Sequence, residues 1–88
     1  MKIEGDTIVF KSTNDNFCKE KSGIKPYTIR RLSLWSEMMS FEQLYFSWKY
    51  NIWQQPQIKI INTDRNEEFT KTISDISQFE GLWIISWR

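Results

Sequence analysis

The sequence contains no histidine and only one cysteine, Cys18. Without an imidazole group, catalysis of the Ser-His-Asp or Cys-His kind is excluded. A single thiol can form neither an intramolecular disulfide nor a cysteine-based zinc site. We therefore expect neither a metal ion nor a cofactor, and any catalysis would have to use lysine, carboxylate, threonine or tyrosine side chains.

Long apolar runs are also missing. No segment approaches the roughly 20 apolar residues that a membrane-spanning helix needs, and residues 1–6 lack the apolar core of a signal peptide. Alanine is absent and valine occurs once, whereas isoleucine, lysine, asparagine and serine are abundant, a bias typical of AT-rich genes of bacteria and their phages. These features predict a cytoplasmic protein that does not enter a membrane.

The length of 88 residues predicts one domain over residues 1–88, and the net charge of +1 provides no general attraction for nucleic acid. The basic residues nevertheless cluster in the first third of the chain, with only Glu20 as an opposing charge. This cluster consists of Lys19, Lys21, Lys25, Arg30 and Arg31. Any anion-binding site is therefore expected in that part of the sequence.

The first third reads as two strands flanking a short helix. Alternating apolar residues predict a strand over 7–11, with another short strand before it. Asn14 or Asp15 could cap a helix that runs through the core-facing Phe17 and ends at Gly23. Because proline disfavours helix, the β-branched and aromatic residues of 27–32 predict the next strand.

The middle of the chain has the best helix signal. Ser40 to Gln43 fits a capping box, and residues 54–56, which include a proline, would end the helix. One apolar face recurs at helical spacing, and it comprises Phe41, Leu44, Tyr45, Trp48 and Ile52. A second aromatic line, Phe46, Tyr50 and Trp53, either covers the sheet or forms an exposed patch for a protein partner, for bases or for a second copy of the chain.

The last third predicts a three-stranded meander over 58–61, 69–76 and 82–87, separated by turn residues. The final segment is apolar on both faces, which is typical of a central strand. The whole pattern predicts the α+β class, with a small, mostly antiparallel, curled sheet, one main helix and one short helix.

The residues Gly23-Ile24-Lys25-Pro26-Tyr27-Thr28-Ile29-Arg30 form a turn that opens directly into a strand. Thr28 and Arg30 are two positions apart and therefore point to the same side of that strand. With Lys25 in the turn, an ammonium, a hydroxyl and a guanidinium group could converge on an anionic ligand. The alternative is a surface turn and an edge strand whose charges are solvated.

This segment, together with Val9-Phe10 and Phe17, resembles the ASCH domain, a small branch of the PUA-like β-barrel superfamily. The resemblance covers about a third of the chain and implies that residues 1–88 form a PUA-like β-barrel with a cleft for RNA or a modified nucleoside. Some ASCH domains hydrolyse acetylated cytidine, which would make Lys25 and Thr28 catalytic and Arg30 the motif arginine. The glutamate of that reaction has no clear counterpart, since Glu67, Glu68 and Glu80 are all available.

Three functions follow. The first is a small binding module for RNA, a nucleotide or a modified nucleoside, with Lys25, Tyr27, Thr28, Arg30 and Arg31 as the ligand-binding residues. The second is a phage-encoded inhibitor or sponge of a host defence system, comparable to anti-CRISPR proteins, which would bind its protein partner through Phe46, Tyr50 and Trp53. The third is an amidohydrolase acting on acylated nucleosides.

Overall fold

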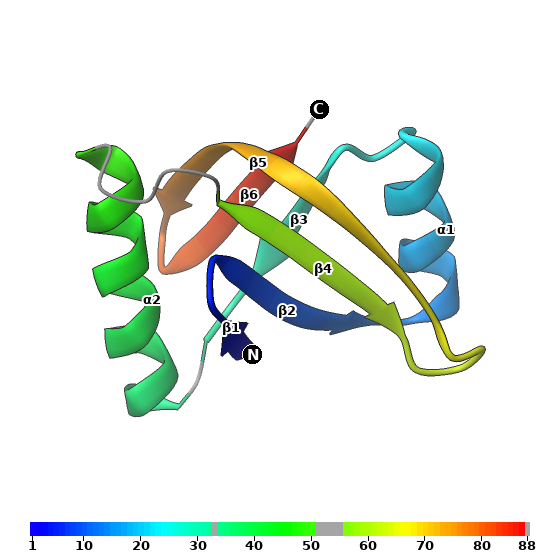
Figure 1. Cartoon of the computed structure of the whole chain (residues 1–88), viewed down its shortest axis with the longest axis horizontal. Helices are drawn as coiled ribbons and strands as arrows, with labels where there is room; N and C mark the ends of the chain where they lie inside the picture. Colours follow the sequence, from blue (N-terminus) through cyan, green and yellow to red (C-terminus); the bar gives the residue numbers. More distant parts are fainter. Residues whose placement is uncertain (33, 51–55, 88) are drawn as a thin grey trace.

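Six strands form one mixed sheet with the order β1-β2-β4-β5-β6-β3, and two helices lie at its opposite ends (Figure 1). The computed structural model describes residues 1–32, 34–50 and 56–87. The elements in chain order are β1 (Lys2–Glu4), β2 (Thr7–Ser12), α1 (Asn14–Ser22), β3 (Tyr27–Arg30), α2 (Trp35–Lys49), β4 (Gln57–Asn62), β5 (Glu67–Phe79) and β6 (Leu82–Trp87).

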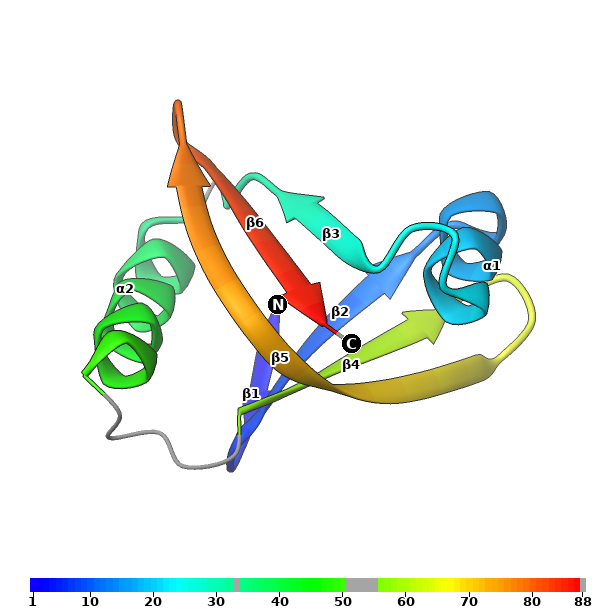
Figure 2. The ribbon, with the colours of Figure 1, turned by 90° about the horizontal axis from the view of Figure 1, so that it is seen from above.

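The sheet curls along β5, which pairs with two different strands over its length. Its first part pairs with β4 and its second part with β6, and the register shifts between Ile73 and Asp75. Every pairing is antiparallel except that of β2 with β4. The curl brings β3 round towards β2 (Figure 2) without closing the sheet. The predicted α+β class with a mostly antiparallel, curled sheet is confirmed, and the sheet is open rather than a closed barrel.

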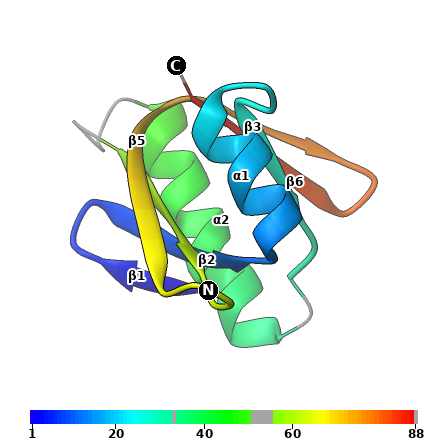
Figure 3. The same ribbon diagram turned by 90° about the vertical axis from the view of Figure 1, so that its right-hand side faces the viewer.

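The core lies inside this curl, between the two helices (Figure 3). Alternate residues of β4 and β6 point inwards, as the period of a strand requires. The buried cluster comprises Ile8, Phe10, Phe17, Phe41, Ile58, Ile60, Ile73, Ile76, Trp83, Ile85 and Trp87. β6 lies between β5 and β3, which confirms the prediction of a central final strand.

The short helix α1 ends as predicted but begins differently. Gly23 follows its last residue with a φ of 85°, a left-handed conformation that glycine adopts without a steric penalty. The capping residue is Thr13, whose side chain makes no capping hydrogen bond. Instead, the backbone N–H of Asn14 donates to the Asp64 carboxylate at 3.2 Å, so a loop distant in sequence satisfies the helix start.

The main helix α2 begins at Trp35, five residues before the predicted capping box at Ser40. That capping prediction is wrong: Ser40 lies inside the helix, and the preceding Leu34 provides no side-chain cap. The predicted inner face is confirmed where the structure describes it, with Phe41 fully buried and Leu44, Tyr45 and Trp48 packed against the core. Ile52 and the predicted helix end at 54–56 lie outside the described residues.

The remaining strand predictions hold with small shifts of their ends. β3 stops at Arg30, so Arg31 and Leu32 lie beyond it, whereas β5 extends further in both directions than the predicted 69–76. Of the helices that the structure describes, neither has the length and apolar character needed to cross a membrane.

Candidate functional site

Arg30 lies where the two edges of the curled sheet approach each other. Its Nη1 donates to the Lys11 carbonyl at 2.7 Å and its Nη2 donates to Ser12 Oγ at 2.7 Å, so it links the end of β3 to β2. Its Nε donates to Thr28 Oγ1 at 2.9 Å, two residues back on the same strand. The guanidinium also lies over the ring of Phe10, 4.7 Å from its centroid. The side chain is therefore held from three directions and has one orientation.

The buried carboxylate of Glu20 joins this group through Ser12. Ser12 Oγ accepts from Arg30 and donates to Glu20 Oε1 at 3.1 Å. Glu20 is 1% exposed, and its Oε2 atom is buried with no hydrogen-bond partner among the described residues. We call Ser12, Glu20, Thr28 and Arg30 the arginine network.

In the sequence, Glu20 is only an opposing charge within the basic cluster, and no motif points to Ser12. A signal for Glu20 was present, because it follows Phe17 by three residues in a helix whose Phe17 faces the core. Spacing of this kind places both side chains on one helix face. The candidates for an acidic partner, Glu67, Glu68 and Glu80, are exposed, and Glu67 lies 3.6 Å from Lys21.

Two features of the environment of Arg30 shift the pKa of its guanidinium in opposite directions. Burial lowers the pKa of the Arg30 guanidinium, and the negative charge of Glu20 opposes that shift. The Arg30 guanidinium nevertheless stays protonated at physiological pH, because the ordinary pKa of arginine lies far above neutrality. Arg30 therefore holds a fixed guanidinium group at the opening of the sheet, and the Glu20 carboxylate behind it partly compensates its charge.

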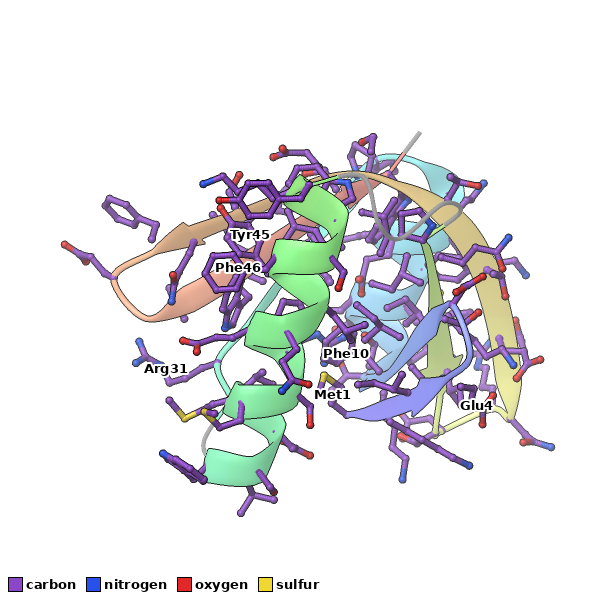
Figure 4. All side chains as sticks on the ribbon, turned by 60° about the vertical axis from the view of Figure 1, so that its left-hand side comes forward. Met1, Glu4, Phe10, Arg31, Tyr45 and Phe46 are labelled. Carbon is purple, nitrogen blue, oxygen red and sulfur yellow. The ribbon has the colours of Figure 1, made fainter. Side chains whose placement is uncertain are left out.

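A cleft of about 620 Å³ opens beside Arg30 and is lined mainly by β1 and β2, and we call it the seam cleft because Arg30 of the edge strand β3 closes one side of it. Its volume falls within the range of roughly 300–1,000 Å³ that is usual for small-molecule sites. Figure 4 labels three of its lining residues around β1 and β2. The lining consists of Met1, Lys2, Glu4, Val9, Phe10, Lys11, Arg30 and Ile61.

The charges in the seam cleft are mainly positive, with three cationic side chains and one carboxylate. Glu4 lies 3.1 Å from Lys2 and 3.9 Å from Lys59. The hydrogen bond and the charge of Lys2 lower the pKa of Glu4, so this group stays ionised at neutral pH. Lys11 is exposed, and only its backbone carbonyl accepts a hydrogen bond from Arg30. Its ammonium group is therefore available at the cleft.

Lys25 does not meet Thr28 and Arg30. Its ammonium lies over the ring of Tyr27, 5.5 Å from the centroid. Because successive residues of a strand point to opposite faces, Tyr27 is on the other side of β3 from Thr28 and Arg30. Of the three groups predicted to converge, the Thr28 hydroxyl and the Arg30 guanidinium meet, whereas the Lys25 ammonium lies elsewhere.

Arg31 lies outside the cleft as well. It follows β3, is exposed, and its Nη1 lies close to Gly81 in the turn between β5 and β6. Figure 4 places Arg31 on the opposite side of α2 from Phe10. Of the five predicted ligand-binding residues, only Arg30 lines the seam cleft, and Thr28 supports it from a buried position.

The aromatic line on α2 points away from the core. Phe46 is 50% exposed and Tyr50 is 66% exposed, and their rings stack with centroids 6.4 Å apart and an interplanar angle of 13°. The interpretation that these rings cover the sheet is therefore wrong. The third member of the line, Trp53, lies outside the described residues.

No family model, no curated protein and no solved structure matches the chain. The resemblance to ASCH domains accordingly stays a prediction. The structural features that bear on function are the arginine network, the seam cleft and the exposed surface of α2.

Proposed function

We propose that the protein binds a nucleotide, either free or as part of single-stranded RNA, in the seam cleft. The observation that carries this proposal is the oriented guanidinium of Arg30 in the cleft wall. Arginine has five N–H donors, and three of them are engaged by Lys11, Ser12 and Thr28. Two donors thus remain for a phosphate oxygen, one on each terminal nitrogen.

The rest of the cleft complements a nucleotide. Val9, Lys11 and Ile61 lie on the same face of β2 and β4, so that Val9 and Ile61 offer apolar surface to a base and Lys11 adds a second cation for phosphate. Apolar walls with a few fixed polar groups are the usual composition of a small-molecule site. Nucleotide binding also fits the predicted cytoplasmic location.

Lys11→Ala is the most direct test, because the Lys11 side chain takes no part in the arginine network. We expect this variant to lose about tenfold in affinity, equivalent to about 1.4 kcal/mol, for a mixture of nucleoside 5′-monophosphates or for a short single-stranded RNA. Isothermal titration calorimetry and fluorescence anisotropy measure the two probes. Binding of RNA alone would identify a polymer site, and binding of both would identify a nucleotide site.

Lys49→Ala is the matched control, since it removes the same charge from an exposed position on α2. It should leave the affinity unchanged. Loss of the Lys11–phosphate contact should also flatten the dependence of affinity on salt, because fewer counterions are released. The proposal fails if neither probe binds, or if both lysine variants weaken binding equally.

The other two functions stay predictions. An amidohydrolase would need Lys25 near Thr28, whereas the Lys25 ammonium lies over Tyr27. A role as an inhibitor of a host defence system would use the exposed rings of α2.

A further inference from the structure

The two ends of the seam cleft differ in charge. At one end, the Arg30 guanidinium donates to the Lys11 carbonyl, and the Lys11 ammonium adds a second cation. At the other end is the carboxylate of Glu4, the only acidic side chain among the described residues that line the cleft. Glu4 faces Thr7 in the pairing of β1 with β2, and Thr7 is four residues from Lys11, a distance of about 13 Å along the strand. Figure 4 likewise shows Glu4 well apart from Phe10.

Glu4, Lys11 and the apolar surface between them lie on one face of the sheet. Residues that are directly opposite each other on paired strands share a face, as do alternate residues of one strand. The register of β1 with β2 therefore puts Glu4 on the same face as Val9 and Lys11. The register of β2 with β4 adds Ile61, which is directly opposite Lys11. A ligand that lies along this face contacts cations at one end, apolar surface in the middle and a carboxylate at the other end.

Two lysines hold the Glu4 carboxylate, one at each oxygen. Lys2 Nζ lies 3.1 Å from Oε1, and Lys59 Nζ lies 3.9 Å from Oε2. An ionised carboxylate accepts about four hydrogen bonds in all, so both oxygens keep lone pairs for further donors. The Glu4 side chain is 45% exposed, and a ligand in the cleft can therefore reach these lone pairs.

The pair of Glu4 and Lys2 complements the Watson–Crick edge of guanine. Guanine presents its N1–H and its 2-amino group side by side, and one carboxylate can accept hydrogen bonds from both. Its O6 atom, next to N1, is an acceptor that suits the Lys2 ammonium. Adenine and cytosine each present one amino donor beside a ring-nitrogen acceptor, and uracil presents one N–H between two acceptors. None of these three bases can donate to both oxygens of a carboxylate through its Watson–Crick edge.

We propose that Glu4 makes the seam cleft selective for guanine nucleotides, by accepting hydrogen bonds from the N1–H and the 2-amino group of the base. The phosphate then lies against Arg30 and Lys11, and the base lies over Val9 and Ile61. This inference rests on the nucleotide proposal and adds the identity of the base to it.

Isothermal titration calorimetry with separate nucleoside 5′-monophosphates tests the selectivity. Guanosine monophosphate should bind about tenfold more tightly than the adenosine, cytidine or uridine monophosphate, because a bidentate contact to a base edge discriminates by at least that factor. Inosine monophosphate, which differs from the guanosine compound only in lacking the 2-amino group, should lose most of this advantage. Equal affinities, or a preference for another base, overturn the guanine inference and leave the nucleotide proposal standing, whereas absence of binding overturns both.

Glu4→Gln tests the role of the carboxylate itself. The variant keeps the size of the side chain but replaces one acceptor oxygen by a donor, so it should abolish the preference for guanosine monophosphate and leave the affinity for adenosine monophosphate nearly unchanged. Glu68→Gln is the matched control, because Glu68 is an exposed carboxylate on the same face, opposite Ile61, that does not line the cleft. A Glu4→Gln variant that retains the preference, or a Glu68→Gln variant that loses it, overturns the inference.

Discussion

The opening of the curled sheet and the outer face of α2, which is its water-exposed apolar side, depart from the usual composition of proteins in opposite ways. At the opening, a carboxylate, two hydroxyls and a guanidinium are wholly or partly withdrawn from water and are joined by hydrogen bonds. On α2, five large apolar side chains stay in contact with water. Burial of polar groups and exposure of apolar groups both cost free energy, so each region is a candidate for a role other than stabilising the fold.

The two regions differ in what they require of a partner. The arginine network is already largely satisfied within the chain, so a ligand has only the remaining donors of Arg30 and the neighbouring lysines to engage. The outer face leaves much of its apolar surface uncovered by the described residues. Substitutions should therefore lower stability more at the opening of the sheet than on the outer face.

The largest contrast should appear between two phenylalanines of the same helix. Phe41→Ala removes a fully buried ring that packs against Trp83 at 4.6 Å, and should lower the free energy of unfolding by about 4 kcal/mol. Phe46→Ala removes a half-exposed ring and should cost about 0.5 kcal/mol. Urea denaturation measures both losses. Equal losses would show that the outer face is part of the core.

Substitutions of the two adjacent arginines should differ almost as much in their effect on the free energy of unfolding. Arg30→Ala removes three hydrogen bonds and leaves the buried Glu20 without its compensating charge, so we expect a loss of about 3 kcal/mol in the free energy of unfolding. Arg31→Ala alters an exposed side chain and should change stability by less than about 0.5 kcal/mol. Thermal and urea denaturation provide the comparison, and an Arg30→Ala variant as stable as Arg31→Ala contradicts the structural role of the network.

The smallest difference in the free energy of unfolding is expected between substitutions of two serines. Ser12→Ala takes away both the acceptor for Arg30 and the donor for Glu20, and should cost about 1 kcal/mol. Ser36→Ala, at an exposed position in the first turn of α2, should be close to neutral. A Ser12→Ala variant that is as stable as the wild type would mean that water replaces the hydroxyl and that Glu20 and Arg30 are not coupled through it.

Much of the fold could be predicted because its signals are local. The apolar alternation of residues 58–61, the glycine that ends α1 and the turn residues before the final strand each act over a few neighbouring positions. The start of α2 could not be predicted in this way. No capping side chain marks Trp35, and the local capping pattern at Ser40 pointed to the wrong position.

The site was predictable only in part. The period of a strand places Thr28 and Arg30 on one side, and their hydrogen bond agrees with that expectation. Lys25 precedes the strand, where no fixed period applies, and its ammonium lies over Tyr27 instead. Ser12 and Glu20 lie 18 and 10 positions from Arg30 in the sequence, and no local pattern relates positions that far apart.

By itself, the sequence determined the class of the fold, the pairing of Thr28 with Arg30 and the presence of two apolar sides on the main helix, because each depends on the repeat of a single element. Only the tertiary structure decided that Ser12 and Glu20 meet Arg30, that a cleft opens beside Arg30, and which side of α2 faces water. These depend on pairings between strands that are distant in the chain, β2 with β4 and β3 with β6, which bring the first third of the sequence into the sheet.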